Sequence, residues 1–388
     1  MDKRKFQKII SFIRAQYNVD KELLPLHSPV FVGNEKKYLN ECIDTTFVSS
    51  VGKFVDSFEV GIENFTGAKK AVACVNGTAA LFLALKIVGV DRESEVITQA
   101  LTFVATANAI TYCGAKPILI DIDPKTLGLS SEKLRQFLNN NVIYNPEKKS
   151  SINKKSGKRI SAIVPMHTFG HPCVIDEIVQ IGREYSIPVI EDAAESLGSF
   201  YKGKHTGTFG EVGVLSFNGN KIITTGGGGM LLFNDVEKAR RAKHLSTTAK
   251  VDHPWEFIHD EVGYNLRLPN INAALGLAQL ERIDEILEVK RNLAESYLNF
   301  FNGLNVPFMK EPENSNSNYW LNTIFLNSKK ERDEFLKLSN ANQVMTRPGW
   351  TLIHKLEMYK DCQTDELEST FDISDKLVNI PSSVNTKG

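Results

Sequence analysis

The chain has no excess of charge of either sign, because its 46 basic residues match its 46 acidic residues. Nucleic-acid-binding domains usually carry a strongly basic surface, so the balance argues against nucleic acid as a partner. The sequence also has no uninterrupted apolar run of about 18 residues, the length that a membrane-spanning helix requires. We therefore expect neither nucleic acid nor a membrane as a partner.

Cysteine is scarce, and no two of the five cysteines form a CxxC pair. Disulfide frameworks and zinc sites usually show close cysteine spacings, so we predict no metal site and expect reduced thiols in a cytoplasmic protein. The N-terminus joins basic and apolar residues, as targeting segments do. However, Phe6, Ile9, Ile10, Ile13 and Tyr17 recur at helical spacing. Residues 1–30 are therefore predicted to form a helical segment packed on the body.

From about residue 67, short apolar runs alternate with amphipathic stretches. This rhythm predicts an α/β fold with a mostly parallel sheet and helices on both of its faces. The polar stretch 139–159 interrupts the rhythm and is interpreted as an exposed insertion. The predicted strands are "AVACV", "EVITQ", "KPILIDI", "ISAIVPM" and "IPVIED", and the predicted helices span 77–88, 104–112, 130–139 and 174–184.

Residues 270–301 carry one long helical pattern with Asn270 as a plausible N-cap. The sequence after it mixes strand-like and helical stretches. We predict a large ligand-binding domain at 31–269 and a smaller α+β domain at 270–388, which includes the long helix as a bridge.

Polar residues follow the predicted strands, where open parallel sheets bind their ligands. Asn76, Gly77 and Thr78 form a strand-to-helix turn, at which free amides and the helix dipole favour a phosphate. Simple N-capping of the helix by Asn76 or Thr78 is the alternative interpretation.

Two carboxylates, Glu191 and Asp192, follow the "IPVI" run. Successive strand side chains point to opposite faces, so only one of the two should face the ligand crevice. The pattern itself does not decide which one. Phe103 could stack on a ligand ring and His167 could line the site, although each could equally be a core or structural residue.

A single lysine, Lys221, lies in "LSFNGNKIITTGGGGM" between an apolar run and four glycines. It could be a solvated lysine in a turn. Alternatively, its amine could condense with an aldehyde cofactor, with the glycines allowing a close approach of the backbone.

In their order, the motifs "NGTAAL", "TFVATANAI", "PMHTFGHP", "IEDAAESLG", "LSFNGNKIITTGGGGM" and "GYNLRLPNINAALGLAQL" resemble the DegT/DnrJ/EryC1/StrS family of sugar aminotransferases. The resemblance covers about residues 25 to 383 and implies the pyridoxal phosphate (PLP)-dependent transferase fold of type I. The stretch "LHSPVFVGNEKKYLNECIDTTFVSSVGKFVDSFE" resembles the subgroup that acts on UDP-2-acetamido-2,6-dideoxy-4-keto-hexoses, including enzymes of legionaminic acid and bacillosamine synthesis.

The resemblance also implies roles for particular residues. Lys221 would form the Schiff base and carry the proton, and Asp192 would pair with the pyridinium nitrogen. Because His167 follows a predicted strand, we add it to these two as a third catalytic residue. The homodimer would share its active sites. The remaining cofactor-binding residues implied are Gly77, Thr78 and Ser216 on the phosphate, Phe103 against the ring, Glu195 and Asn218 nearby, and Asn265 from the other subunit.

Two positions depart from the family pattern. Gly227 stands where "TTGEGG" carries an acid, and Glu195 stands where many members have glutamine or histidine. A carboxylate at 195 would repel the phenolic oxygen of the cofactor unless it is protonated or paired.

The resemblance predicts transfer of an amino group from an amino acid, with glutamate expected, to the C4 keto carbon of a nucleotide-linked sugar. Two rivals remain. A dehydratase of the same fold would carry histidine in place of Lys221, and a non-catalytic binding protein would not require both Lys221 and Asp192.

Overall fold

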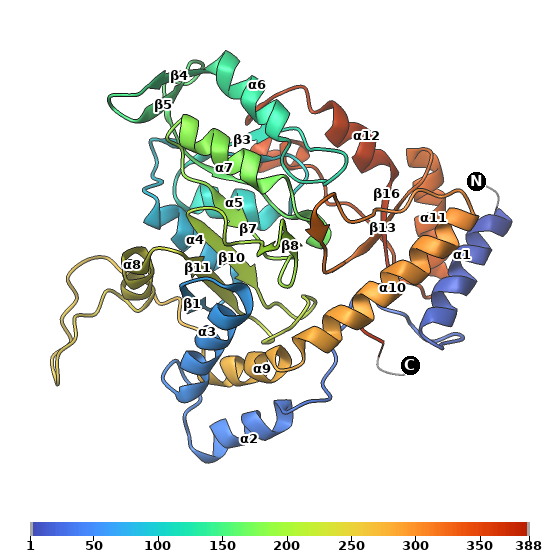
Figure 1. The fold of residues 1–388 in the computed structure, drawn as a ribbon, viewed down its shortest axis with the longest axis horizontal. Helices are drawn as coiled ribbons and strands as arrows, with labels where there is room; N and C mark the ends of the chain where they lie inside the picture. Colours follow the sequence, from blue (N-terminus) through green and yellow to red (C-terminus); the bar gives the residue numbers. More distant parts are fainter. Residues whose placement is uncertain (1–2, 386–388) are drawn as a thin grey trace.

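A large twisted sheet forms the centre of the computed structural model, which describes residues 3–385 (Figure 1). Its strands lie in the order β1-β11-β10-β7 and β6-β2-β3-β15, with the hairpin β4-β5 beyond β6. Bridges from Ile163 to Val189 and from Met166 to Asp192 join the two halves. The strands are β1 (Lys70–Cys74), β2 (Ser94–Gln99), β3 (Lys116–Ile120), β4 (Val142–Asn145), β5 (Ser150–Asn153), β6 (Arg159–Val164), β7 (Ile190–Asp192), β10 (Val212–Ser216), β11 (Gly229–Phe233) and β15 (Gln363–Thr364).

The strand directions agree with the predicted mostly parallel sheet. β3, β2 and β6 are parallel, β7 and β10 are parallel, and β11 runs antiparallel between β10 and β1. The carboxyl ends of β1, β2, β6, β7 and β10 therefore meet along one edge. As the sequence predicts, the polar turns that follow these strands lie together.

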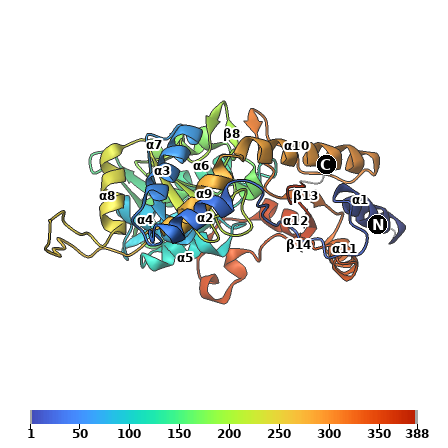
Figure 2. The ribbon, with the colours of Figure 1, turned by 90° about the horizontal axis from the view of Figure 1, so that it is seen from below.

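Helices cover both faces of the sheet (Figures 1 and 2). Val96 packs into the core beneath α4 and α8, whereas its neighbour Ile97 packs into the core beneath α6 and α7. This alternation explains why these strands read as continuous apolar runs. The helices of this region are α2 (Glu35–Asp44), α3 (Lys53–Thr66), α4 (Gly77–Ile87), α5 (Val104–Tyr112), α6 (Ser131–Asn141), α7 (Ile175–Glu184) and α8 (Val236–Ser246), with the short η1 (Thr168–Gly170) and strands β8 (Phe200–Tyr201) and β9 (Lys204–His205).

The expected insertion at 139–159 is instead a β-hairpin that extends the sheet. β4 and β5 pair antiparallel, and β5 continues onto β6. Asn153 is buried, and its amide donates to Glu95 Oε2 (2.6 Å) and Gln363 Oε1 (2.8 Å). Lys148, Lys149, Lys154 and Lys155 lie in the exposed turns before and after β5.

The prediction of a single helix at 270–301 is wrong. The structure has two helices there, α9 (Asn270–Leu280) and α10 (Ile283–Gly303), and their axes point in different directions (Figure 1). Glu281 at the break accepts hydrogen bonds from Asn34 (2.7 Å) and Tyr38 (2.6 Å), which hold the end of α9. The N-cap expectation is also corrected. Asn270 begins α9, and its side chain accepts the N–H of Phe54 at the start of α3 (3.0 Å).

The C-terminal part forms a small three-stranded sheet, β13-β16-β14, which packs with α1 and α10 in one apolar core. Phe6, Ile9, Ile10 and Ile13 of α1 are buried there, as the helical spacing predicts. β15 belongs to the C-terminal part of the chain but returns to pair with β3 of the large sheet. The domain boundary predicted at residue 270 therefore remains a prediction. The remaining elements are α1 (Lys3–Gln16), β12 (Ser315–Asn316), β13 (Asn322–Phe325), α11 (Lys329–Ala341), β14 (Arg347–Pro348), η2 (Ile353–Lys355), η3 (Glu357–Tyr359), α12 (Glu368–Lys376) and β16 (Leu377–Ile380). Within residues 3–385, no helix has the length and apolar character needed to cross a membrane.

Candidate active site

A cavity of about 260 Å³ lies at the edge where the parallel strands end. It brings together residues that are up to 152 positions apart in the sequence, from Asn76 to Gly228. Eight of the ten predicted site residues line it: Gly77, Thr78, Phe103, Asp192, Glu195, Ser216, Asn218 and Lys221.

One wall of the cavity is the N-terminus of α4. Asn76 caps this helix, since its Oδ1 accepts the N–H of Ala79 (2.8 Å). A Cβ atom at Gly77 would lie 2.9 Å from Cβ of Ser216, so only glycine lets the serine approach the helix end this closely. The same turn therefore both caps α4, through Asn76, and lines the cavity. The free amides and the hydroxyls of Thr78 and Ser216 make a cradle suited to a phosphate group.

The amine of Lys221 is held from two directions. Its Nζ donates to Glu195 Oε1 (3.2 Å) and lies 4.0 Å from the centroid of the Trp320 ring. Only 13% of the lysine side chain is exposed. These contacts argue against a solvated lysine in a turn.

Glu195 is buried and has partners for both oxygens. Besides Lys221, its carboxylate accepts the N–H of Phe169 (2.9 Å). Burial raises the pKa of Glu195 to about 7, although the positive charge of Lys221 opposes this shift. Glu195 is therefore both paired and able to take up a proton near neutral pH, the two conditions under which a carboxylate is tolerated beside an anion.

The structure distinguishes the two carboxylates at the end of β7. Asp192 lines the cavity, where its oxygens accept from Thr106 Oγ1 (2.7 Å) and the N–H of Ala194 (3.2 Å). Burial raises the pKa of Asp192 above its ordinary value.

Glu191 points to the opposite side of β7, as strand geometry requires. Burial disfavours its charge, but hydrogen bonds from His167 and the neighbouring amides dominate and lower its pKa. Its carboxylate ties the turn before β10 to the strand. The donors are His167 Nε2 (3.0 Å) and the N–H groups of Gly207 (2.7 Å), Phe209 (2.6 Å) and Gly210 (2.7 Å).

Phe103 and Gly227 line other parts of the cavity. The Phe103 side chain is 47% exposed, which is unusual for a large apolar ring and leaves its surface available to a ligand. Gly227 has no positive φ, and a Cβ atom built there would meet only the Val75 carbonyl oxygen, at 4.0 Å. The fold therefore does not demand glycine at this position.

Two predicted site residues lie outside the cavity. The expectation that His167 lines it is wrong, because the imidazole is fully buried and directed to Glu191 on the far side of β7. Its backbone N–H donates to the Asp192 carbonyl (3.1 Å), so it touches the site only through the main chain. Asn265 is exposed, accepts from Arg267 Nε (2.9 Å) of the same chain, and does not line the cavity of its own chain.

Two residues that the sequence reasoning missed contact site residues directly. Thr106 holds Asp192 and lies three residues after Phe103, inside the motif "TFVAT". Trp320 packs against Lys221 although it is 99 positions later in the sequence. An aromatic residue in "NYWLN" has no signal that distinguishes it from ordinary core.

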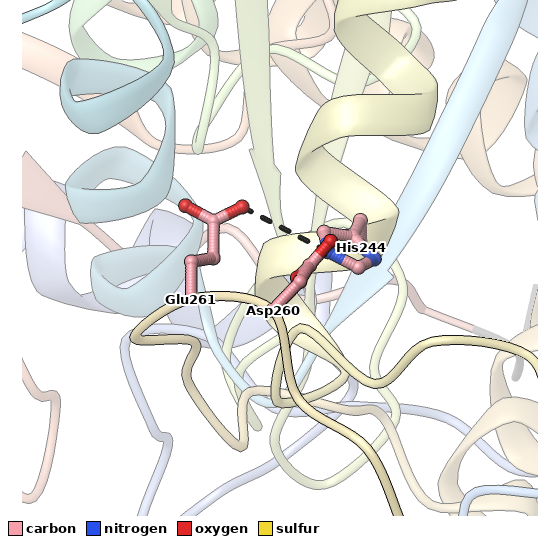
Figure 3. A group of neighbouring side chains, drawn as sticks. All are labelled: His244, Asp260 and Glu261. Carbon is pink, nitrogen blue, oxygen red and sulfur yellow. Dashed lines mark hydrogen bonds and ion pairs between the residues drawn. The ribbon is translucent and has the colours of Figure 1, made fainter.

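Within residues 3–385, one group has the composition of a cation site: His244, Asp260 and Glu261 (Figure 3). His244 Nε2 lies 2.7 Å from Asp260 Oδ1 and 3.7 Å from Glu261 Oε1. The guanidinium of Arg241 already pairs with both oxygens of Glu261. We interpret the group as an ion-pair cluster that fastens the following loop to α8.

The model of the DegT/DnrJ/EryC1/StrS aminotransferase family matches residues 31–388. The chain belongs to this family. Its members are PLP-dependent sugar aminotransferases with the fold of type I, so both the predicted fold and the predicted cofactor are confirmed. The cavity fits that cofactor, with a phosphate cradle at Gly77, a buried carboxylate at Asp192 and an amine at Lys221.

Named relatives extend over nearly the whole chain. GDP-perosamine synthase of Escherichia coli O157:H7 is 36% identical over 359 residues, which cover 92% of this chain and 93% of the relative. EpsN of Bacillus subtilis (strain 168), whose name describes a pyridoxal phosphate-dependent aminotransferase, is 36% identical over 365 residues, covering 93% and 91%. The crystal structure of the aminotransferase TlmJ from Streptoalloteichus hindustanus superposes with a TM-score of 0.83 at 26% identity, covering 93% of both chains. The family is thereby established, and the predicted subgroup remains a prediction.

Proposed function

We propose that this aminotransferase transfers the amino group of glutamate to the C4 keto carbon of a nucleotide-linked 4-keto-6-deoxy sugar. The observation that carries the proposal is the placement of Lys221. Its amine lies in a cavity with a phosphate cradle and a buried carboxylate, in a chain of a sugar aminotransferase family.

Each side chain has a distinct task in this proposal. When bound, PLP supplies an aldehyde that accepts the amino group and a ring that draws electrons from the reacting carbon. Asp192 would hold the ring nitrogen, while Thr106 keeps the carboxylate oriented. Lys221 would anchor the cofactor and move a proton at its Nζ atom. Glu195, with a pKa of about 7, can accept a hydrogen bond from that amine or hold a proton itself.

The nucleotide is the finer part of the proposal. The resemblance of the N-terminal stretch favours UDP-2-acetamido-2,6-dideoxy-4-keto-hexose, whereas the names of three relatives at 36–37% identity favour a GDP-linked sugar. We favour the UDP sugar, because the whole stretch from Leu26 to Glu59 carries that resemblance.

A panel of nucleotide sugars tests this choice. The purified enzyme is incubated with PLP, glutamate and UDP-, GDP- or dTDP-linked 4-keto-6-deoxy sugars, and the products are analysed by NMR. We expect amination at C4 of the UDP sugar. Its kcat/KM should be at least about tenfold above that of the GDP sugar. A preference for the GDP sugar would reject the UDP assignment, and loss of the 6-deoxy sugar's C3 hydroxyl without amination would favour the dehydratase.

We further propose that two copies of the chain share their active sites. The loop after α8, residues 248–263, extends away from the body in Figures 1 and 2. Three of its apolar side chains are more than three-quarters exposed: Trp255 (77%), Phe257 (83%) and Val262 (84%). Exposed apolar groups of this size favour burial against a partner. The loop leads directly to Asn265, which we assign to the active site of the other subunit.

Subunit complementation tests the shared site. Lys221→Ala and Asn265→Ala protomers are mixed under conditions of subunit exchange, which mass spectrometry verifies. If the site is shared, a mixed dimer has one intact site and one site with both lesions, so activity should return to about a quarter of wild type with random pairing. If Asn265 acts within its own chain, every site carries one lesion, and mixing restores nothing.

A further inference from the structure

The Trp320 side chain packs against Lys221. In the sequence it lies between β12 and β13, in the C-terminal part of the chain. It is only 4% exposed and does not line the cavity. Any effect on the reaction must pass through the residues that it touches.

The indole touches the lysine and the turn that carries it. Its ring centroid lies 4.0 Å from Lys221 Nζ, within the range of a cation–π contact. Its Nε1–H donates to the carbonyl of Asn220 (2.6 Å), the residue immediately before the lysine. Within the same turn, the N–H of Lys221 donates to the Asn218 carbonyl (3.1 Å). Both the backbone and the amine of Lys221 are thus fixed by one side chain.

The main chain that carries the indole is also anchored. The N–H of Trp320 donates to Asn318 Oδ1 (2.8 Å), and the same asparagine amide donates to the carbonyls of Glu195 and Leu197 (2.8 Å each). Tyr319 between them has a φ of 48°, a strained conformation for a tyrosine. The segment therefore links Trp320 to Glu195, which holds the amine of Lys221 from its other side.

We propose that Trp320 is a positioning residue for Lys221, and that it holds the lysine turn and the free amine between the indole face and the carboxylate of Glu195. This inference rests on the proposed role of Lys221 as the residue that moves the proton. Small displacements of such a group can change rates by about 100-fold, even when the change lies outside the reacting groups.

Two substitutions distinguish the contribution of the indole ring from that of its Nε1–H group. Trp320→Leu removes both contacts and should lower kcat by about 10- to 100-fold, with the KM for the nucleotide sugar within about threefold of wild type. Trp320→Phe keeps an aromatic face and should retain kcat within about fivefold. The absorbance spectrum of the PLP-loaded protein should change in Trp320→Leu and resemble wild type in Trp320→Phe. Phe301→Leu, at a fully buried ring of the C-terminal core, is the matched control for loss of stability.

Three results would overturn the inference: wild-type kcat in Trp320→Leu, equal losses of kcat in the leucine and phenylalanine variants, or an equal loss in Phe301→Leu. Lys221→Ala is measured alongside. If that variant still transfers amino groups, the proposed role of Lys221 fails. If it is inactive while Trp320→Leu is unaffected, only the role of Trp320 fails.

Discussion

Replacing Glu195 by glutamine should change how the stability of the protein depends on pH. Burial raises the pKa of Glu195 from 4.5 to about 7. Between these two pH values the folded protein keeps a proton that the unfolded chain has released. By linkage, the free energy of unfolding falls as the pH rises through this window and levels off above pH 7.

The size of the effect follows from the pKa difference. A difference of about 2.5 units at about 1.4 kcal/mol per unit corresponds to about 3 kcal/mol. Glutamine does not titrate, yet its amide oxygen can still accept from Lys221 or Phe169. Glu195→Gln should therefore gain up to about 3 kcal/mol in stability relative to wild type as the pH rises from 5 to 8.

Urea unfolding of both proteins at a series of pH values measures this gain. Both proteins are first freed of PLP, because cofactor binding adds its own contribution to stability. Comparing the two proteins cancels the titration of the groups that do not interact with Glu195. A stability difference that stays constant with pH, or that moves in favour of wild type at high pH, would refute the assigned protonation of Glu195.

Other substitutions test the remaining geometry. Asp192→Asn should lower kcat by on the order of 100-fold or more while PLP still binds, because an amide cannot stabilise a protonated ring nitrogen. Glu191→Gln should instead lower the free energy of unfolding by about 2–4 kcal/mol, since it weakens four hydrogen bonds of the buried Glu191 carboxylate. An equal loss of kcat in a stable Glu191→Gln protein would contradict this division. Gly227→Ala should change the free energy of unfolding by less than about 0.5 kcal/mol, whereas Gly229→Ala should cost about 1–3 kcal/mol, because its Cβ would lie 2.5 Å from the backbone of Asn76. A lower urea unfolding midpoint for Gly227→Ala than for Gly229→Ala would contradict these assigned roles of the two glycines.

Much of the fold was predictable because its signals are local. The apolar runs and amphipathic stretches from β1 to β7 have the spacing of a buried strand or a helix, and their alternation defines the parallel sheet. The break between α9 and α10 was not predictable, because no proline or glycine marks it and the partners of Glu281 at the break, Asn34 and Tyr38, are distant in sequence. The hairpin β4-β5 was missed because only Val142, Ser151 and Asn153 of its strands are buried, and two of these three are polar residues in a lysine-rich stretch.

The candidate site was predictable to the extent that its residues follow strands. Asp192 and Lys221 both lie after strands that end at the same edge, and the resemblance selected Asp192 where strand alternation left a choice. His167 obeys the same rule, yet its ring points away from the cavity, because placement after a strand does not fix a rotamer. Trp320 could not be predicted, since the return of the C-terminal segment to Glu195 is a tertiary contact without a sequence signature.

The chemistry attributed to Lys221 is the central claim, and reductive trapping tests it most directly. The PLP-loaded enzyme is treated with borohydride, digested and mapped by mass spectrometry. The Lys221→Ala variant is treated in parallel, and it is also assayed for transfer of ¹⁵N from labelled glutamate to a 4-keto sugar. The account predicts that the cofactor is fixed to the peptide containing Lys221, and that the folded variant binds PLP but transfers no ¹⁵N. Fixation to another lysine, or substantial ¹⁵N transfer by the variant, would contradict it.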